Sequence, residues 1–152
     1  MKENYRELNG DLINLAKAGE FDVIAHGCNC FGRMKRGIAP QMAQAFGCDE
    51  FELESSKYNG HINKLGQIDY KKVGTVYVVN AYTQYYWGTE TKPFDYDAFT
   101  LCMRKIAFEF EGKHIWLPKI GSHLAGGDWE RIKKIIQKEL EPCFVTVVNY
   151  KP

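Results

Sequence analysis

The 152 residues are enough for one well-buried core and too few for two ordinary domains, so we expect a single domain over residues 1–152. With 45% hydrophobic and 26% charged residues, the composition is that of a folded globular protein and excludes disordered or collagen-like chains. The net charge of +1, without a long run of one sign, gives no signature of binding to a nucleic-acid backbone or a membrane surface. Any anionic ligand must therefore be bound by local groups.

The absence of membrane-span and signal-peptide patterns, and the spacing of the cysteines, bear on where the protein is located and on whether it binds a metal. No segment approaches the roughly 20 apolar residues of a membrane span, and residues 1–10 lack the apolar core of a signal peptide, so we expect a cytoplasmic protein. Five cysteines without framework spacing favour free thiols. Cys28 and Cys30 form a C-x-C pair, but no second pair completes a zinc site, so we expect no metal and no other cofactor. A buried thiol is the favoured role for Cys30, with a nucleophile as the lesser alternative.

Short β-branched or aromatic runs alternate with longer segments of helical period, which predicts an α/β domain with a mostly buried sheet. Residues 47–66 are the least regular part. In chain order the pattern predicts a strand at 5–8, a helix at 11–19 closed by Gly19, a strand at 22–27, a helix at 37–46 with Pro40 in its first turn, strands at 66–72 and 75–82, a helix at 97–110, a strand at 113–119, a helix at 129–140 capped by Asp128, and a strand at 143–150.

Two junctions, residues 23–46 and 117–132, each run from an apolar strand through a glycine-containing loop into a helix. Glycine lets successive backbone N–H groups approach an anion, and a helix N-terminus adds a favourable dipole. Ligands of open α/β sheets bind at the carboxyl ends of strands, so the pair predicts a diphosphate site, although either loop alone is equally well a structural turn. Neither junction matches the G-x-x-x-x-G-K-[ST] loop or the G-x-G-x-x-G fingerprint.

Four segments, in this order and spacing, resemble the macro domain family: "NGDLINL", "HGCNCFGRMKRGIAPQMA", "VVNAYTQYYWG" and "LPKIGSHLAGGDWERI". The resemblance covers nearly the whole chain. It is greatest to the compact single-domain branch that includes ADP-ribose-1″-phosphate phosphatases and terminal ADP-ribose glycohydrolases. The resemblance implies a three-layer α/β/α domain around a mixed, mostly buried sheet, with ADP-ribose bound in a cleft at the strand ends.

The resemblance also assigns the binding residues. Asp11 would accept a hydrogen bond from the adenine amino group, the backbone amide of Leu12 would contact the ring, and Asn29 would lie beside the distal ribose. The diphosphate would lie between two loops, formed by Gly37, Ile38 and Ala39 on one side and by Gly121, Ser122, His123, Leu124, Ala125 and Gly126 on the other.

His26, Asn29 and His123 are the catalytic candidates. His26 matches a histidine to which the phosphatase branch assigns a catalytic part, and with a pKa near 6.5 it would protonate a leaving oxygen or orient water; a core histidine is the alternative. His123 would donate to phosphate oxygens or shuttle protons, or act as a bulky lid. Thr83 and Gln84 end another expected strand, beside aromatic residues that would cover the distal ribose or pack in the core.

Four positions depart from the family in ways that bear on chemistry. Ala43 and Ala125 stand where the lysine-dependent glycohydrolases carry their lysine and aspartate, so that route is disfavoured. Lys35 and Arg36 replace small residues of the first loop, and would either pair with a terminal phosphate or lie in solvent.

We therefore expect a domain that binds ADP-ribose and hydrolyses the terminal phosphate of ADP-ribose-1″-phosphate or of a related ADP-ribose derivative. The alternative is a non-catalytic reader of free ADP-ribose or of an ADP-ribosylated protein. A third hypothesis is a cleft that has diverged towards another nucleotide-like ligand.

Overall fold

The computed structural model describes residues 4–18, 21–87, 93–121 and 126–150. Within these residues the strands form one six-stranded sheet in the order β1-β6-β5-β2-β4-β3. Only β3 runs antiparallel, against β4, and the other neighbours pair in parallel. The strands are β1 (Tyr5–Gly10), β2 (Val23–Asn29), β3 (Ile68–Val73), β4 (Val76–Gln84), β5 (His114–Pro118) and β6 (Phe144–Tyr150).

The helices begin where an aspartate caps the first turn in three cases out of four. Asp11 accepts a hydrogen bond from the amide of Asn14, Asp95 from that of Ala98, and Asp128 from that of Glu130. The predicted cap at Asp128 is thereby confirmed, whereas the predicted closure at Gly19 lies outside the described residues. The four helices are α1 (Leu12–Lys17), α2 (Ala39–Phe46), α3 (Tyr96–Glu109) and α4 (Trp129–Glu139).

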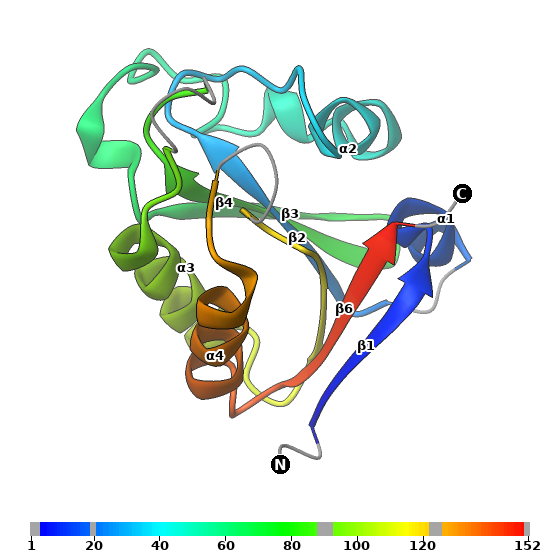
Figure 1. The fold of residues 1–152 in the computed structure, drawn as a ribbon. Helices are drawn as coiled ribbons and strands as arrows, with labels where there is room; N and C mark the ends of the chain where they lie inside the picture. The colour runs from blue at the N-terminus through cyan, green and yellow to red at the C-terminus, as the bar shows by residue number, and fades with distance from the viewer. Residues whose placement is uncertain (1–3, 19–20, 88–92, 122–125, 151–152) are drawn as a thin grey trace.

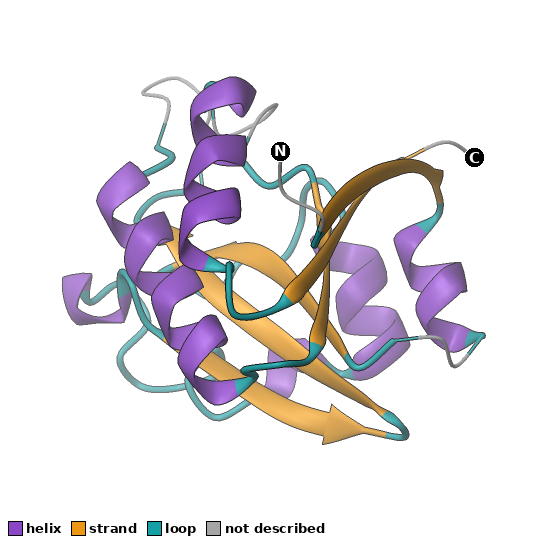
Figure 2. Ribbon diagram, turned by 90° about the horizontal axis from the view of Figure 1, so that it is seen from below, coloured by secondary structure: helices purple, strands orange, loops and turns teal. Residues whose placement is uncertain are grey.

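The helices cover both faces of the sheet and make three layers (Figure 1). The view from below shows the α3–α4 pair on one side and the α1 and α2 helices on the other (Figure 2). Because most strands are buried on both faces, they are apolar along nearly their whole length; every residue of β2 except Gly27 is buried. The expected three-layer α/β/α fold with a mixed sheet is confirmed.

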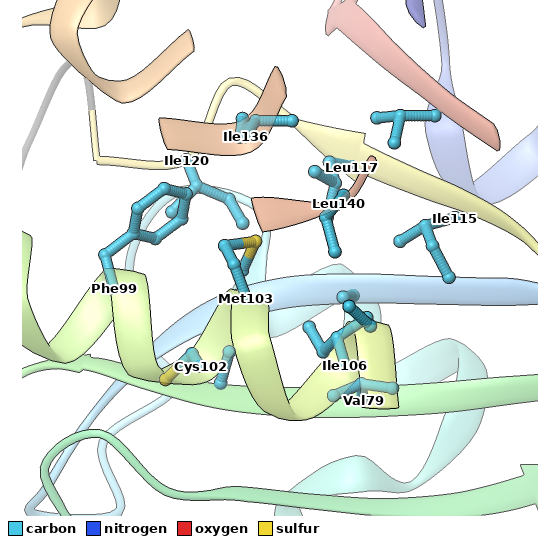
Figure 3. Close-up of a cluster of buried hydrophobic side chains, with 14 of the residues drawn as sticks. Val79, Phe99, Cys102, Met103, Ile106, Ile115, Leu117, Ile120, Ile136 and Leu140 are labelled. Carbon is cyan, nitrogen blue, oxygen red and sulfur yellow. The ribbon is translucent and has the colours of Figure 1, made fainter. Parts of the chain in front are cut away.

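The larger core lies between the sheet and the α3–α4 pair. Phe99, Met103 and Ile106 of α3 meet Ile136 of α4, and all four side chains are fully buried (Figure 3). Both helices, predicted at 97–110 and 129–140, thus carry their apolar side chains on one face, and these faces hold them to the sheet. A second core lies under α1 and α2 and includes the stacked rings of Phe21 and Trp116, whose centroids are 3.8 Å apart.

Residues 47–66 contain two short 3-10 helices, η1 (Cys48–Glu50) and η2 (Ile62–Lys64), and are tied to the sheet by buried polar groups. The amides of Leu53 and Glu54 donate to one carboxylate oxygen of Asp69, and the Tyr82 hydroxyl lies 3.0 Å from Glu54 Oε1 and 3.2 Å from Asp69 Oδ1. Lys64 Nζ lies 4.7 Å from the centroid of the Tyr82 ring. We call Glu54, Lys64, Asp69 and Tyr82 the Tyr82 cluster; its hydrogen bonds replace the regular secondary structure that this segment lacks.

Candidate ligand-binding cleft

A cleft with a volume of about 1110 Å³ crosses the carboxyl ends of five neighbouring strands, from β1 to β4. It lies where parallel α/β sheets bind their ligands. With adjacent strands about 4.8 Å apart, the β1 and β4 ends of the cleft are about 19 Å from each other. The cleft is lined at its β1 end by Asn9, Asp11, Leu12, Ile13, Val148, Asn149 and Tyr150, and at its β4 end by Thr83, Gln84 and Trp87.

Asp11 and Leu12, the predicted adenine-binding residues, both line the β1 end of the cleft. The Asp11 carboxylate accepts a hydrogen bond from the backbone amide of Asn14 through Oδ1, at 3.1 Å. Leu12 is the first residue of α1, so its amide belongs to the first turn, whose N–H groups have no partner within the helix. Asp11 thus fixes the start of α1 with one oxygen and has a second oxygen for another donor.

Asn29 lines the middle of the cleft, but most of its hydrogen-bonding capacity serves the loop that follows β2. Its Oδ1 accepts from the amides of Phe31 at 2.9 Å and Arg33 at 3.3 Å, and its Nδ2 donates to the Arg33 carbonyl at 2.8 Å. The side chain is 8% exposed. Asn29 therefore shapes the loop, and one N–H of its carboxamide is left to meet a ligand.

The N-terminus of α2 forms a second wall of the cleft through Gly37, Ile38 and Ala39, as predicted. Gly37 has a φ of 61°, a conformation that a side chain would disfavour. Ile38 occupies the N-cap position and has no oxygen with which to accept from the first-turn amides, and Pro40 lies in that turn as expected. The Ala39 amide donates to the Arg36 carbonyl at 3.3 Å and Pro40 has no N–H, so the Gln41 amide and the helix dipole are what this turn offers to an anion.

The cleft is electropositive although the chain as a whole is nearly neutral. Among the described residues that line it, Arg33, Lys35, Arg36 and Lys119 carry a positive charge and Asp11 carries a negative charge. The first three lie in the loop between β2 and α2, and all three are exposed. The guanidinium of Arg33 lies 4.1 Å from the centroid of the Trp87 ring, which holds it at the β4 end.

The predicted loop after β5 is described only at its ends. Gly121 lines the cleft with a φ of 75°, and a Cβ at this position would lie 2.3 Å from the Phe94 ring. Gly126 is exposed, with a φ of 77°, and is not among the residues that line the cleft. Ser122, His123, Leu124 and Ala125 lie outside the described residues.

The prediction that His26 points into the cleft is wrong. The ring is fully buried, is absent from the lining, and lies with Nε2 2.7 Å from Asn80 Oδ1, 3.6 Å from Cys28 Sγ and 3.7 Å from Cys48 Sγ. Asn80 donates its Nδ2 to the Cys48 carbonyl, so its Oδ1 accepts a hydrogen bond from the His26 Nε2–H, and the buried Nδ1 has no partner among the described residues. Burial lowers the pKa of His26 to about 4.

The cysteines beside the cleft are protonated and enclosed. Burial raises the pKa of Cys28 well above its usual value and the pKa of Cys30 to about 11. Cys28 lines the cleft but is only 6% exposed, and Cys30 is fully buried with its Sγ 3.5 Å from the Gln84 carbonyl. The favoured structural role of Cys30 agrees with this geometry.

Arg33, Trp87 and Tyr150 line the cleft but were not among the predicted site residues. Their position in the sequence could have indicated them, because each lies at or just after the carboxyl end of a strand that meets the cleft. In the part of the chain that the structure describes, no group of three His, Cys, Asp or Glu side chains is arranged to hold a metal ion. No helix within the same residues is long and apolar enough to cross a membrane.

Comparisons with known proteins agree with this geometry, although no protein-family profile matches the sequence. An uncharacterized 17.5 kDa protein of enterobacteria phage T4, from the tk-vs intergenic region, is 31% identical over 156 residues, which cover 95% of this chain and 96% of the phage protein. A macrodomain protein from Streptomyces coelicolor has a similar structure, with a TM-score of 0.68 and 23% identity, over 97% of this chain and 99% of that one. A Trypanosoma brucei macrodomain, crystallised with ADP-ribose, superposes with a TM-score of 0.66 and 15% identity, over 97% of this chain and 63% of that one.

Proposed function

We propose that this chain, which has the macrodomain fold, binds ADP-ribose in its cleft. The observation that carries the proposal is the order of groups along the cleft. A carboxylate lies at the β1 end, helix N–H groups and cations lie in the middle, and polar and aromatic side chains lie at the β4 end. This order corresponds to a purine, a diphosphate and a sugar. The T. brucei macrodomain, which was crystallised with ADP-ribose, lends support from a shared fold.

At the β1 end, Asp11 and the amide of Leu12 bind the adenine. The carboxylate oxygen that does not cap α1 accepts a hydrogen bond from the exocyclic amino group, and the Leu12 N–H contacts the ring. One side chain thus both starts a helix and recognises the base. The two tasks are separable by substitution, because asparagine caps a helix as well as aspartate does.

In the middle of the cleft, the diphosphate lies against Gly37, Ile38 and Ala39 on one side and Gly121 on the other. The Gln41 amide in the first turn of α2 donates to its oxygens, and the helix dipole favours the negative charge. We propose that Ser122, His123, Leu124 and Ala125 complete the second wall, as the family resemblance implies.

The test of ligand and orientation is calorimetric titration of the purified protein with ADP-ribose, using Asp11→Asn and Asp11→Ala. We expect both variants to lose at least tenfold in affinity, because the adenine amino group loses its charged acceptor, which is worth about 1–3 kcal/mol. Asp11→Asn should keep the stability of the parent, whereas Asp11→Ala should also lose about 1 kcal/mol of unfolding free energy with the cap. Asp97→Asn, in the first turn of α3 and outside the cleft, is the control. Parental affinity in Asp11→Asn would contradict the adenine position.

We further propose that the natural ligand carries a phosphate on its distal ribose. ADP-ribose has two phosphates, whereas four cations line the described part of the cleft, and Arg33 lies at the β4 end, where the distal ribose would be. ADP-ribose-1″-phosphate should therefore bind more tightly than ADP-ribose, and Arg33→Ala should bring the two affinities together. Lys71→Ala, on the exposed face of β3, is the control.

Hydrolysis of that phosphate is a separate proposal, and the position of His26 changes how it must be tested. A neutral imidazole enclosed by Asn80 and two cysteines does not reach a substrate in the cleft, so its part in turnover would be to position β2. His123 and Asn29 remain the candidates for direct contact with the phosphate. Phosphate release from ADP-ribose-1″-phosphate by the parent, lost in His123→Ala with ADP-ribose affinity retained, would support a phosphatase. Tight binding without release after long incubation would identify a reader.

A further inference from the structure

Thr83 lies at an irregularity of the sheet beside the cleft. The parallel register of β2 and β4 runs through Cys28 opposite Tyr82 and then shifts, so that Asn29 lies opposite Gln84 and Thr83 is the extra residue. The carbonyl of Thr83 accepts from the amide of Asp95, which fixes the bulge to the start of α3. Bulges redirect side chains, and they are frequent next to binding sites.

The Thr83 hydroxyl is buried without a partner. The residue is 1% exposed, and its Oγ1 has no hydrogen bond to any residue that the structure describes. The other buried polar side chains of β4 are paired: Asn80 with His26 and the Cys48 carbonyl, and Tyr82 with two carboxylates. An unpaired buried hydroxyl costs free energy, so one that persists calls for an explanation.

Thr83 nevertheless lines the cleft, and Gly27 of the neighbouring strand is the reason that its hydroxyl is open. A Cβ on Gly27 would lie 2.9 Å from Thr83 Oγ1 and 3.1 Å from Ile120 Cγ2. Gly27 also lines the cleft, and no side chain fits between its Cα and the hydroxyl, so the hydroxyl packs directly against the glycine at the edge of the cleft. Any other residue at this position would cover the hydroxyl.

The place of Thr83 in the sheet indicates which part of a ligand reaches it. Asp11 follows β1 and Thr83 lies in β4, at opposite ends of the cleft, about 19 Å apart by strand spacing. If adenine binds at Asp11 and the diphosphate at the start of α2, the distal sugar lies over β2 and β4. A hydroxyl is both donor and acceptor, and a sugar hydroxyl can pair with it in either sense.

We propose that Thr83 is a specificity-determining residue whose Oγ1 hydrogen-bonds a hydroxyl of the distal ribose, and that Gly27 keeps this contact open. The inference rests on the proposed binding of ADP-ribose and adds the group by which the cleft distinguishes a nucleoside diphosphate that carries a second sugar from one that does not. Thr83 lies at the end of the cleft where the sugar would be linked to any further group.

Calorimetric titration of Thr83→Val with ADP-ribose and with ADP tests the inference. Valine keeps the shape of threonine and lacks the hydroxyl, so we expect affinity for ADP-ribose to fall about tenfold while affinity for ADP changes less than twofold. Thr83→Ser should regain most of the lost affinity. Thr100→Val is the matched control, because this hydroxyl donates to the Tyr96 carbonyl within α3 and is remote from the cleft.

Gly27→Ala is a second variant that retains the Thr83 hydroxyl but displaces it, because the new Cβ would lie 2.9 Å from Oγ1, and it should show the same selective loss of ADP-ribose affinity. Equal affinity of Thr83→Val and the parent for ADP-ribose would overturn the inference, and so would a parallel loss for both ligands. Failure of the parent itself to bind ADP-ribose would instead overturn the proposed function. A melting temperature of Thr83→Val at or above that of the parent would show that the hydroxyl has no structural partner.

Discussion

Tyr82 and Thr83 are consecutive residues of β4, both are buried, and both carry a hydroxyl, yet their surroundings differ completely. The Tyr82 hydroxyl lies within 3.2 Å of two carboxylates, whereas the Thr83 hydroxyl has no partner among the described residues. Successive side chains of a strand point to opposite faces, so Tyr82 faces the segment 47–66 and Thr83 faces the cleft. The Tyr82 hydroxyl is bound within the protein, whereas the Thr83 hydroxyl is left for a ligand. Substitutions on the first face should change stability, and those on the second should change binding.

His26 belongs with the Tyr82 face, so its removal should give the largest loss of stability. We expect His26→Ala to lower the unfolding free energy by about 2–4 kcal/mol, because it leaves a cavity and an unpaired Asn80 oxygen. ADP-ribose affinity of the folded variant should stay within threefold of the parent. Urea unfolding measures the stability and calorimetric titration measures the affinity. His61→Ala, at an exposed histidine, is the control. Unchanged stability with lost affinity would place the ring in the cleft after all.

Tyr82→Phe should be the next most damaging change. It removes the donor shared by Glu54 and Asp69, so we expect a loss of about 1–3 kcal/mol of unfolding free energy with no effect on ADP-ribose affinity. Thr83→Val should show the reverse, with affinity lost and stability kept. Equal effects of the two substitutions on stability would remove the contrast between the two faces.

The pH dependence of stability should also arise on the Tyr82 face. Burial raises the pKa of Glu54 to about 7, so the folded state binds more protons than the unfolded state and stability falls as pH rises from about 4.5 to 7. The pKa of His26 is lowered to about 4, so its contribution has the opposite sign and stability rises between about pH 4 and 6.5.

In Glu54→Gln the contribution of His26 should therefore emerge. Between pH 4.5 and 6.5 we expect the slope of unfolding free energy against pH to become more positive than in the parent, by up to about 1.4 kcal/mol per pH unit. Urea unfolding at a series of pH values measures both slopes. Identical slopes in parent and variant would mean that Glu54 titrates near its usual pKa.

The cations of the cleft should give the smallest effects, and only on binding. Lys35→Ala and Arg36→Ala should each weaken ADP-ribose binding about two- to fivefold, since both side chains are exposed and water screens their charge. The difference from the parent should shrink as salt is raised, and stability should be unchanged. Binding that is insensitive to salt in the parent would show that neither cation meets the diphosphate.

The fold could be predicted from the sequence because its signals are local. Six apolar runs, two amphipathic stripes and the cap at Asp128 each depend on neighbouring residues, and each lies where it was expected. The start of α2 was placed at the cleft because the carboxyl ends of strands converge there, whereas Asp11 was placed there by the family resemblance. The family resemblance added the identity of the ligand to be tested.

His26 and the Tyr82 cluster show where local signals end. Both faces of β2 carry apolar residues. The pattern therefore did not reveal that the His26 ring is enclosed by the protein and does not face the cleft. Glu54 and Lys64 come from the least regular segment, and their burial depends on Asp69 and Tyr82, which follow later in the chain. The Thr83 hydroxyl lacks a partner at a register shift between β2 and β4, and this shift is visible only once the two strands are paired in the structure.

The position of β6 in the sheet sets an order in which the cleft can assemble during translation. β6 is made after all the other strands, yet it lies between β1 and β5, and residues 5–10 pair with residues 145–150. β1, the strand that leads into Asp11, therefore has no strand to pair with until residues 144–150 have left the ribosome, whereas β2 and β4, which hold Gly27 and Thr83, can pair earlier. A nascent chain gains the sugar end of its cleft first and the base end last.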